Sequence, residues 1–279
     1  MNASCPIAPP RPPSPPAPLC SERGLLLPTL FVIGSMKAGS TTIWAHAVEH
    51  AKPYITAGSP TDKGAISRKE KDFFGDPSMY RRGRRWYEKI WPTCPRQRPG
   101  LASDTLIGID ATPAYHVFHG APQNMAQFYG PVRLPQLRLV WVLREPVSKF
   151  WSYYWEIEIY GNLPGFEDFT RPKLARAQEC LRRDPASPLW PPSLPPPYTN
   201  CAPHLDHGLY EPHLRRWLQF FEASQLLLVS FRHFTSVCWA THASNAALLT
   251  QAMHGCRMLH RVPLHANLGV GWRMLATLR

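Results

Sequence analysis

One lysine and a run of hydroxyl residues follow a short apolar segment near the start of the chain. They lie in the sequence Gly34-Ser35-Met36-Lys37-Ala38-Gly39-Ser40-Thr41-Thr42. A glycine loop between a strand and a helix presents backbone N–H groups to an anion, and the positive end of the helix dipole adds to the attraction. The segment therefore predicts a phosphate-binding loop. The alternative is an ordinary strand–turn–helix whose lysine is solvated.

A second candidate anion site follows another apolar segment. Arg144 ends this segment, and Ser152 lies early in the helix predicted after it. In parallel α/β sheets, ligands bind beyond the carboxyl ends of the strands, where the Lys37 loop would also lie. An arginine can donate paired hydrogen bonds to a phosphate, and a serine can donate one more. Two anion sites at one edge suit a ligand with two separated phosphates. The alternative is a structural ion pair of Arg144 with Glu145 or Glu156.

Both segments resemble the donor-binding motifs of the sulfotransferases that use PAPS, 3′-phosphoadenosine 5′-phosphosulfate. The family's 5′-phosphosulfate loop, Lys-x-Gly-Thr-Thr, is similar to Lys37-Ala38-Gly39-Ser40-Thr41. Its 3′-phosphate motif, Leu-Arg-Asp-Pro followed by Ser-x-Tyr, is similar to Leu143-Arg144-Glu145-Pro146 followed by Ser152-Tyr153-Tyr154. The resemblance implies that the 5′ side of PAPS is bound by Lys37, Ala38, Gly39, Ser40 and Thr41. It implies that Arg144 and Ser152 bind the 3′-phosphate.

Further segments resemble the heparan-sulfate-type and related carbohydrate sulfotransferases, and the likeness covers roughly residues 30–234. A family block, Lys-Glu-x-x-Phe-Phe, whose glutamate serves as base, is similar to Lys69-Glu70-Lys71-Asp72-Phe73-Phe74. The resemblance implies that Glu70 takes the proton of the acceptor, with Asp72 as the second choice. The alternative is that Glu70 is a surface carboxylate paired with a neighbouring basic residue.

The resemblance implies transfer of a sulfuryl group from PAPS to a hydroxyl or amine of a carbohydrate, with Lys37 and Glu70 as catalytic residues. The expected acceptor is a glycosaminoglycan-like anionic polysaccharide, and the expected location is the Golgi lumen. No metal is expected, because sulfuryl transfer needs positioning and charge stabilisation and the sequence has no metal-ligand cluster. Three departures from the family bear on activity. Ala111 replaces a lysine, Arg232-His233 replace an acidic pair, and residues 240–279 lack a Lys-Gly-Arg loop.

The chain has 279 residues and a formal net charge of +12, which favours a polyanionic partner. Nucleic acid is not favoured, because no DNA- or RNA-binding motif is visible. Cys180 and Cys201 flank a Pro-rich loop and could form a disulfide in an oxidising compartment. No apolar run reaches the roughly 20 residues of a membrane span, and residues 1–22 lack a signal-peptide pattern. The sequence thus predicts neither signal nor anchor, and the cytoplasm is the alternative location.

Apolar segments alternating with amphipathic ones predict an α/β fold with a P-loop-like parallel sheet and helices on both faces. Strands are expected at 30–33, 106–109, 137–143 and 225–229. Helices are expected near 40–48, 80–91, 147–160 and 209–221. For the domain organisation, we expect a disordered Pro-rich segment at 1–23, a sulfotransferase domain at 24–239 and a divergent or truncated tail at 240–279.

Two other functions fit parts of the sequence. A P-loop nucleotide kinase would use Asp110, at the end of a predicted strand, to bind Mg²⁺, although the lysine that should follow Gly39 is missing. A catalytically inactive polyanion-binding protein would use the positive charge alone. Turnover of ATP with Mg²⁺ would favour the kinase. Salt-sensitive glycan binding without sulfuryl transfer would favour the binding protein.

Overall fold

A single parallel sheet organises the part of the chain that the computed structural model describes, residues 18–51, 54–60, 69–95, 106–159, 161, 163–183 and 204–240. Within these residues the sheet has five strands in the order β2-β3-β1-β4-β5, and every pairing is parallel. The strands are β1 (Pro28–Gly34), β2 (Ile55–Thr56), β3 (Ile107–Ala111), β4 (Arg138–Leu143) and β5 (Leu226–Ser230). The predicted α/β fold with a parallel sheet is therefore confirmed.

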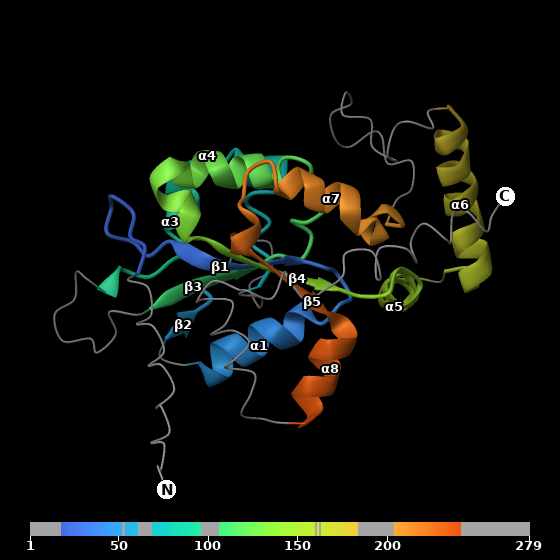
Figure 1. Ribbon diagram of the computed structural model, residues 1–279, viewed down its shortest axis with the longest axis horizontal. Helices are drawn as coiled ribbons and strands as arrows, with labels where there is room; N and C mark the ends of the chain where they lie inside the picture. The colour runs from blue at the N-terminus through green and yellow to red at the C-terminus, as the bar shows by residue number, and fades with distance from the viewer. Residues whose placement is uncertain are drawn as a thin grey trace, which may run out of the picture.

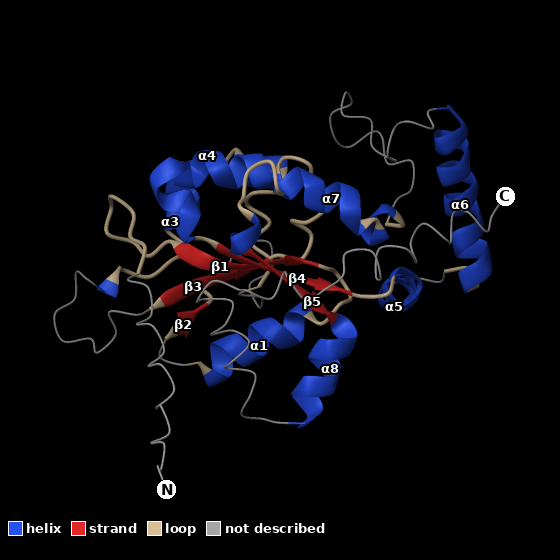
Figure 2. Ribbon diagram, in the orientation of Figure 1, coloured by secondary structure: helices blue, strands red, loops and turns tan. Residues whose placement is uncertain are grey.

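Helices cover both faces of the sheet, as the sequence predicts. Figures 1 and 2 show two helices against one face, α1 (Ser40–His50) and α8 (Phe231–Ala240). The other face carries α3 (Gly83–Glu88), α4 (Ala121–Arg133) and α7 (Tyr210–Trp217). To one side of the sheet lie α5 (Pro146–Glu158) and α6 (Phe166–Arg183), and the short α2 (Pro77–Tyr80) precedes α3.

The central strand shows how the sequence builds these layers. Successive side chains of a strand point to opposite faces, so a strand covered on both sides is apolar throughout. Phe31 of β1 belongs to the core cluster that contains Phe128 of α4. Its neighbour Val32 belongs to the cluster on the other face, with Ile43 of α1. The continuous apolar run before Gly34 therefore indicates a central strand. The lysine loop follows the carboxyl end of this strand, so it lies at the carboxyl edge of the sheet.

The predicted helix at 80–91 is wrong in its extent. Gly83 has a φ of 78°, and this left-handed conformation separates α2 from α3. Tyr87 of α3 still reaches the core, where its ring stacks on Phe73 with centroids 4.4 Å apart. The aromatic residues that suggest one long helix thus belong to two short helices, and they pack around the same core residue.

The first described residues are attached to the domain. Leu19 is buried in the main core cluster, and Cys20 forms a disulfide with Cys94, 74 positions away in the sequence. The disulfide considered from the sequence, between Cys180 and Cys201, lies outside the described residues, because Cys201 and the side chain of Cys180 are not among them. Residues 1–17 and 241–279 lie outside the described residues as well, so the domain division stays a prediction. No helix among the described residues is long and apolar enough to cross a membrane.

Candidate active site

A pocket of about 640 Å³ lies at the carboxyl edge of the sheet. Four strands end at this pocket. The segments that follow β1, β3, β4 and β5 contribute Lys37, Pro113, Arg144 and Phe231 to its wall. This is where ligands of parallel α/β sheets bind, and its size is typical of sites for small molecules. The structure therefore brings the two segments predicted to bind anions into one cavity.

The lysine loop joins β1 to α1 in a conformation that opens the helix N-terminus to the pocket. Lys37 and Gly39 have φ values of 60° and 83°, in the left-handed region. Gly39 is the N-cap of α1, and no side chain caps this helix. Ser40 and Thr41 line the pocket, whereas Ala38 is buried in the core beneath the loop. The uncapped N–H groups and the helix dipole form an anion-binding terminus beside Lys37.

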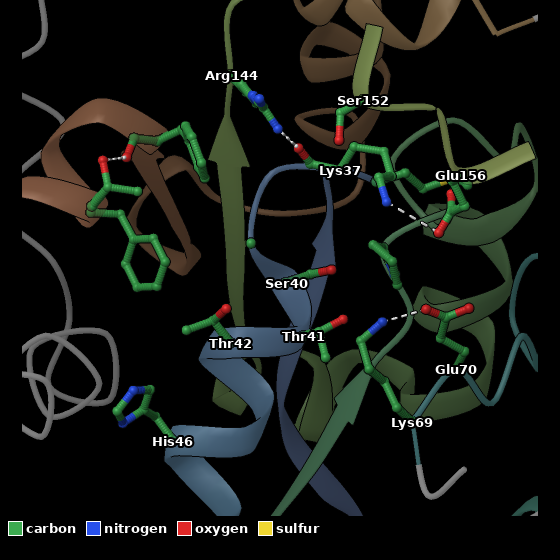
Figure 3. Close-up of a pocket in the computed structure, with 16 residues that line it drawn as sticks. Lys37, Ser40, Thr41, Thr42, His46, Lys69, Glu70, Arg144, Ser152 and Glu156 are labelled. Carbon is green, nitrogen blue, oxygen red and sulfur yellow. Dashed lines mark hydrogen bonds and ion pairs between the residues drawn. The ribbon is translucent and has the colours of Figure 1, made fainter. Parts of the chain in front are cut away.

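Arg144 lies next to the lysine loop. One guanidinium nitrogen donates a 2.6 Å hydrogen bond to the carbonyl oxygen of Lys37 (Figure 3). The guanidinium also packs over the ring of Phe231. The Tyr210 hydroxyl holds the Arg144 backbone, donating to its carbonyl oxygen at 2.6 Å. Guanidinium carries five N–H donors, so the contact with Lys37 leaves others for an anion. Ser152 of α5 lines the same pocket.

Glu70 enters the pocket from the segment that precedes α2. Its backbone N–H donates to the carbonyl oxygen of Ala111 at the end of β3, at 3.1 Å, and its φ is 63°. Its carboxylate is paired with the ammonium group of Lys69 (Figure 3). Asp72, the second choice for the base, is not among the residues that line the pocket. Of these two carboxylates, the structure places only Glu70 beside the lysine loop.

Comparison with known proteins gives two kinds of relative. No family model matches the chain. Bifunctional heparan sulfate N-deacetylase/N-sulfotransferase 2 of Bos taurus is 27% identical over 203 residues, which are 73% of this chain and 20% of that protein. The corresponding protein 3 of Mus musculus is 28% identical over 207 residues, 74% of this chain and 20% of that protein. The chain thus spans about a fifth of the length of these relatives.

A solved structure gives the fold. The crystal structure of a sulfotransferase from Alicyclobacillus acidocaldarius superposes with a TM-score of 0.53 at 20% identity, covering 82% of this chain and 81% of that one. The chain is a distant homologue of sulfotransferases. The superposition with the bacterial sulfotransferase covers most of this sulfotransferase homologue. The family resemblance read from the sequence is confirmed at this level.

The kinase interpretation requires Asp110 to bind Mg²⁺. In this sulfotransferase homologue, Asp110 instead accepts hydrogen bonds inside the core. Asp110 is fully buried, and its carboxylate accepts hydrogen bonds from the hydroxyls of Tyr87, Thr112 and Tyr115 at 2.7, 2.8 and 3.1 Å. Burial raises the pKa of this carboxyl, against the effect of these bonds. Asp110 does not line the pocket. Among the described residues, no group of three or more His, Cys, Asp or Glu could hold a metal ion.

Sequence reasoning missed part of the pocket wall of the sulfotransferase homologue. Phe231 and Phe234, one turn apart on α8, face the lysine loop, and a methyl group at Gly39 would meet Phe234 at 3.1 Å. The signal was available, because Phe231 directly follows an apolar strand, as Arg144 does. Glu156 also lines the pocket, four residues after Ser152 on α5. Glu156 pairs with Lys37. The alternative ion pair between Glu156 and Arg144, which the sequence left open, is not formed.

A buried group of ionisable side chains lies around the start of α7. His213 is 3% exposed; its Nδ1 accepts from Arg216 at 3.0 Å and its Nε2 donates to the carbonyl oxygen of Asp206 at 3.1 Å. Both contacts suit a neutral imidazole. Burial, aided by the positive charge of Arg216, lowers the pKa of His213 to about 3. Burial also lowers the pKa of Lys149 to about 7 and raises that of Asp206 to about 7.

We expect His213 to make the fold sensitive to acid. Its pKa is lower in the folded state than the usual 6.5, so its contribution to stability is complete above pH 6.5 and is lost as the pH falls toward 3. Asp206 acts oppositely, because its raised pKa favours the folded state at low pH. Relative to the wild type, His213→Gln should therefore gain about 2 kcal/mol of unfolding free energy as the pH falls from 6.5 to 5. Urea unfolding of both proteins at both pH values measures this; a difference in unfolding free energy that stays the same at the two pH values would contradict it.

Proposed function

We propose that the pocket binds PAPS and that the chain transfers its sulfuryl group to a hydroxyl or amine of a carbohydrate. One observation carries the proposal: the helix terminus beside Lys37 and the pair Arg144 and Ser152 line the same cavity. Two anion sites in one pocket suit a nucleotide that carries a phosphate at each side of its ribose. The distant homology to N-sulfotransferase proteins supports the same donor.

The residues of the pocket fit such a donor. Ser40, Thr41 and the uncapped N–H groups of α1 would hold the 5′-phosphate, while Arg144 and Ser152 would hold the 3′-phosphate. The phenyl rings of α8 close the wall over Gly39. PAPS, when bound, supplies the sulfuryl group. Lys37 would place its ammonium group where negative charge develops on the leaving phosphate.

Glu70 is our candidate for the base. Glu70 offers its carboxylate to the pocket with about half of its side chain exposed to solvent, so an acceptor can reach it. An acceptor hydroxyl or amine approaching the sulfur would give its proton to this carboxylate. Lys69, paired with Glu70, would hold the carboxylate in place before the acceptor arrives.

The acceptor and the location are proposed on other grounds. The relatives' names refer to heparan sulfate, and the net charge of +12 suits an anionic polysaccharide. The Cys20–Cys94 disulfide suits an oxidising compartment, which supports the Golgi lumen over the cytoplasm. We therefore propose a glycosaminoglycan-like acceptor that meets the enzyme in the secretory pathway.

Two measurements test the function. Calorimetry compares adenosine 3′,5′-bisphosphate (PAP) with AMP, and the proposal requires that PAP bind more tightly, since only PAP occupies both anion sites. Labelled PAPS is then offered with a panel of glycans, with and without EDTA, and transfer should survive EDTA. Equal affinity for PAP and AMP would overturn the donor assignment. Glycan binding without transfer would favour a polyanion-binding protein, and Mg²⁺-dependent turnover of ATP would favour a kinase.

Arg144→Ala should remove the advantage of PAP over AMP. A charged hydrogen bond contributes about 1.5–3 kcal/mol, so the affinity for PAP should fall roughly 10- to 100-fold while that for AMP changes little. Calorimetry on the variant measures both affinities. Arg171→Ala, which removes an exposed arginine of α6 paired with Glu167, is the matched control. An equal loss for both ligands would show that Arg144 acts only by holding the Lys37 loop, against the 3′-phosphate assignment.

A further inference from the structure

The side chain of Lys37 has a partner that the proposed mechanism does not use. The ammonium nitrogen lies 3.2 Å from a carboxylate oxygen of Glu156 (Figure 3). The Lys37 backbone is held separately, because its carbonyl oxygen accepts a hydrogen bond from Arg144. With the backbone fixed, the ion pair decides where the ammonium group points. Before a donor binds, Glu156 thus holds the cation that is proposed to meet the reacting sulfuryl group.

Glu156 is placed for this role by the helix that also carries Ser152. The two residues are four positions apart on α5, so they lie on the same face of the helix, one turn from each other. Ser152 is the proposed ligand of the 3′-phosphate. The wall that would bind one end of the nucleotide therefore also presents a carboxylate to the lysine at the other end.

The charges of the pocket make this carboxylate unfavourable for an anionic ligand. Among its lining residues, the cationic side chains Lys37, Lys69 and Arg144 face the carboxylates Glu70 and Glu156. Lys69 is already paired with Glu70. A nucleotide with phosphates at both ends carries several negative charges, and like charges within a few ångströms repel each other. Glu156 would lie beside the phosphosulfate oxygens if it kept its contact with Lys37.

We propose that Glu156 is an internal counter-anion that competes with the sulfuryl donor for Lys37. Without donor, the carboxylate neutralises the ammonium group and fixes it over the pocket. The incoming phosphosulfate displaces the carboxylate, and the ion pair forms again when the nucleotide product leaves. Glu156 is therefore a positioning residue that lowers nucleotide affinity and speeds product release. This inference rests on the proposed function of the pocket.

The test compares nucleotide binding by matched charge variants. Glu156→Gln keeps the size of the side chain and removes the charge, so PAP should bind roughly three- to tenfold more tightly, and the rate of PAP release should fall. Glu158→Gln, on the same helix but not lining the pocket, removes the same charge and should leave the affinity unchanged. The gain should disappear in the Lys37→Ala background, because no ammonium group remains for the carboxylate to hold. Calorimetry and stopped-flow displacement supply these values.

The outcomes separate this inference from the proposed function. If the wild-type protein binds PAP no better than AMP, the function itself fails. If it binds PAP well but Glu156→Gln binds it equally or more weakly, the function stands and the counter-anion role is overturned. The role is also overturned if Glu158→Gln gives the same gain, because the effect is then one of net charge. The same gain in the Lys37→Ala background would overturn it too.

Discussion

Replacing Lys37 with alanine should reduce sulfuryl transfer by about 10²- to 10³-fold. The lysine lies in a loop whose backbone is fixed at a φ of 60° and by the hydrogen bond from Arg144, so its ammonium group starts from a defined position. A preorganised cation that meets the leaving phosphate stabilises charge that is greater in the transition state than in the ground state. Its loss should therefore lower kcat more than it weakens donor binding.

The measurement is the initial rate of transfer from labelled PAPS at saturating and limiting donor. Lys89→Ala is the control, because this exposed lysine follows α3 and does not line the pocket. Circular dichroism and thermal unfolding show whether each variant keeps the fold. Transfer at the wild-type rate by a folded Lys37→Ala protein would remove the lysine from the mechanism.

The sheet could be predicted because its signals are local. Leu30 to Ile33 are all apolar, as a strand buried on both faces requires, and the glycine that follows ends the run at the lysine loop. The same logic placed Arg144 at the end of β4. Once the strands are parallel, the carboxyl ends meet at one edge, so the approach of Lys37 and Arg144 follows from topology. This part of the site needed no knowledge of side-chain packing.

Other features depend on contacts that the sequence does not encode locally. Helix α4 was not predicted; Pro122 lies in its first turn, where proline is tolerated, and the helix is kinked at Gly130, whose φ is 67°, just before Pro131. The Cys20–Cys94 disulfide joins the residues before β1 to the segment that follows α3, a pairing that spacing alone cannot choose. The disulfide depends on contacts between distant parts of the chain, which bring its two cysteines together.

The ion pair of Glu156 shows another limit of prediction from the sequence. The helical spacing from Ser152 puts this carboxylate on the wall of the pocket, and that much could be predicted. Its choice between Lys37 and Arg144 could not, because both cations lie at the same edge. The structure resolves the choice by giving Arg144 to the Lys37 carbonyl oxygen and to the ring of Phe231, which leaves the ammonium group for Glu156.

Replacing Glu70 with glutamine should lower transfer by about 10²- to 10⁴-fold, the usual contribution of a general base. Glutamine keeps the shape and can still accept a hydrogen bond from Lys69, but it cannot take a proton. Because Glu70→Gln differs from the wild type only in the group that would accept the proton, the loss should appear in kcat and not in donor binding. The kcat at saturating donor, and the affinity for PAP by calorimetry, measured for both proteins, test this.

Asp72→Asn distinguishes the base from its neighbour. The Asp72 backbone is held by Thr112, whose hydroxyl accepts from its N–H at 3.3 Å, and Asp72 does not line the pocket. Its amide variant should therefore retain most of the transfer rate. The opposite pattern, with Asp72→Asn inactive and Glu70→Gln active, would move the base to Asp72. Such a result would require the segment that precedes α2 to rearrange when the acceptor binds, because Glu70 is the carboxylate that this segment now turns toward Lys69 and the lysine loop.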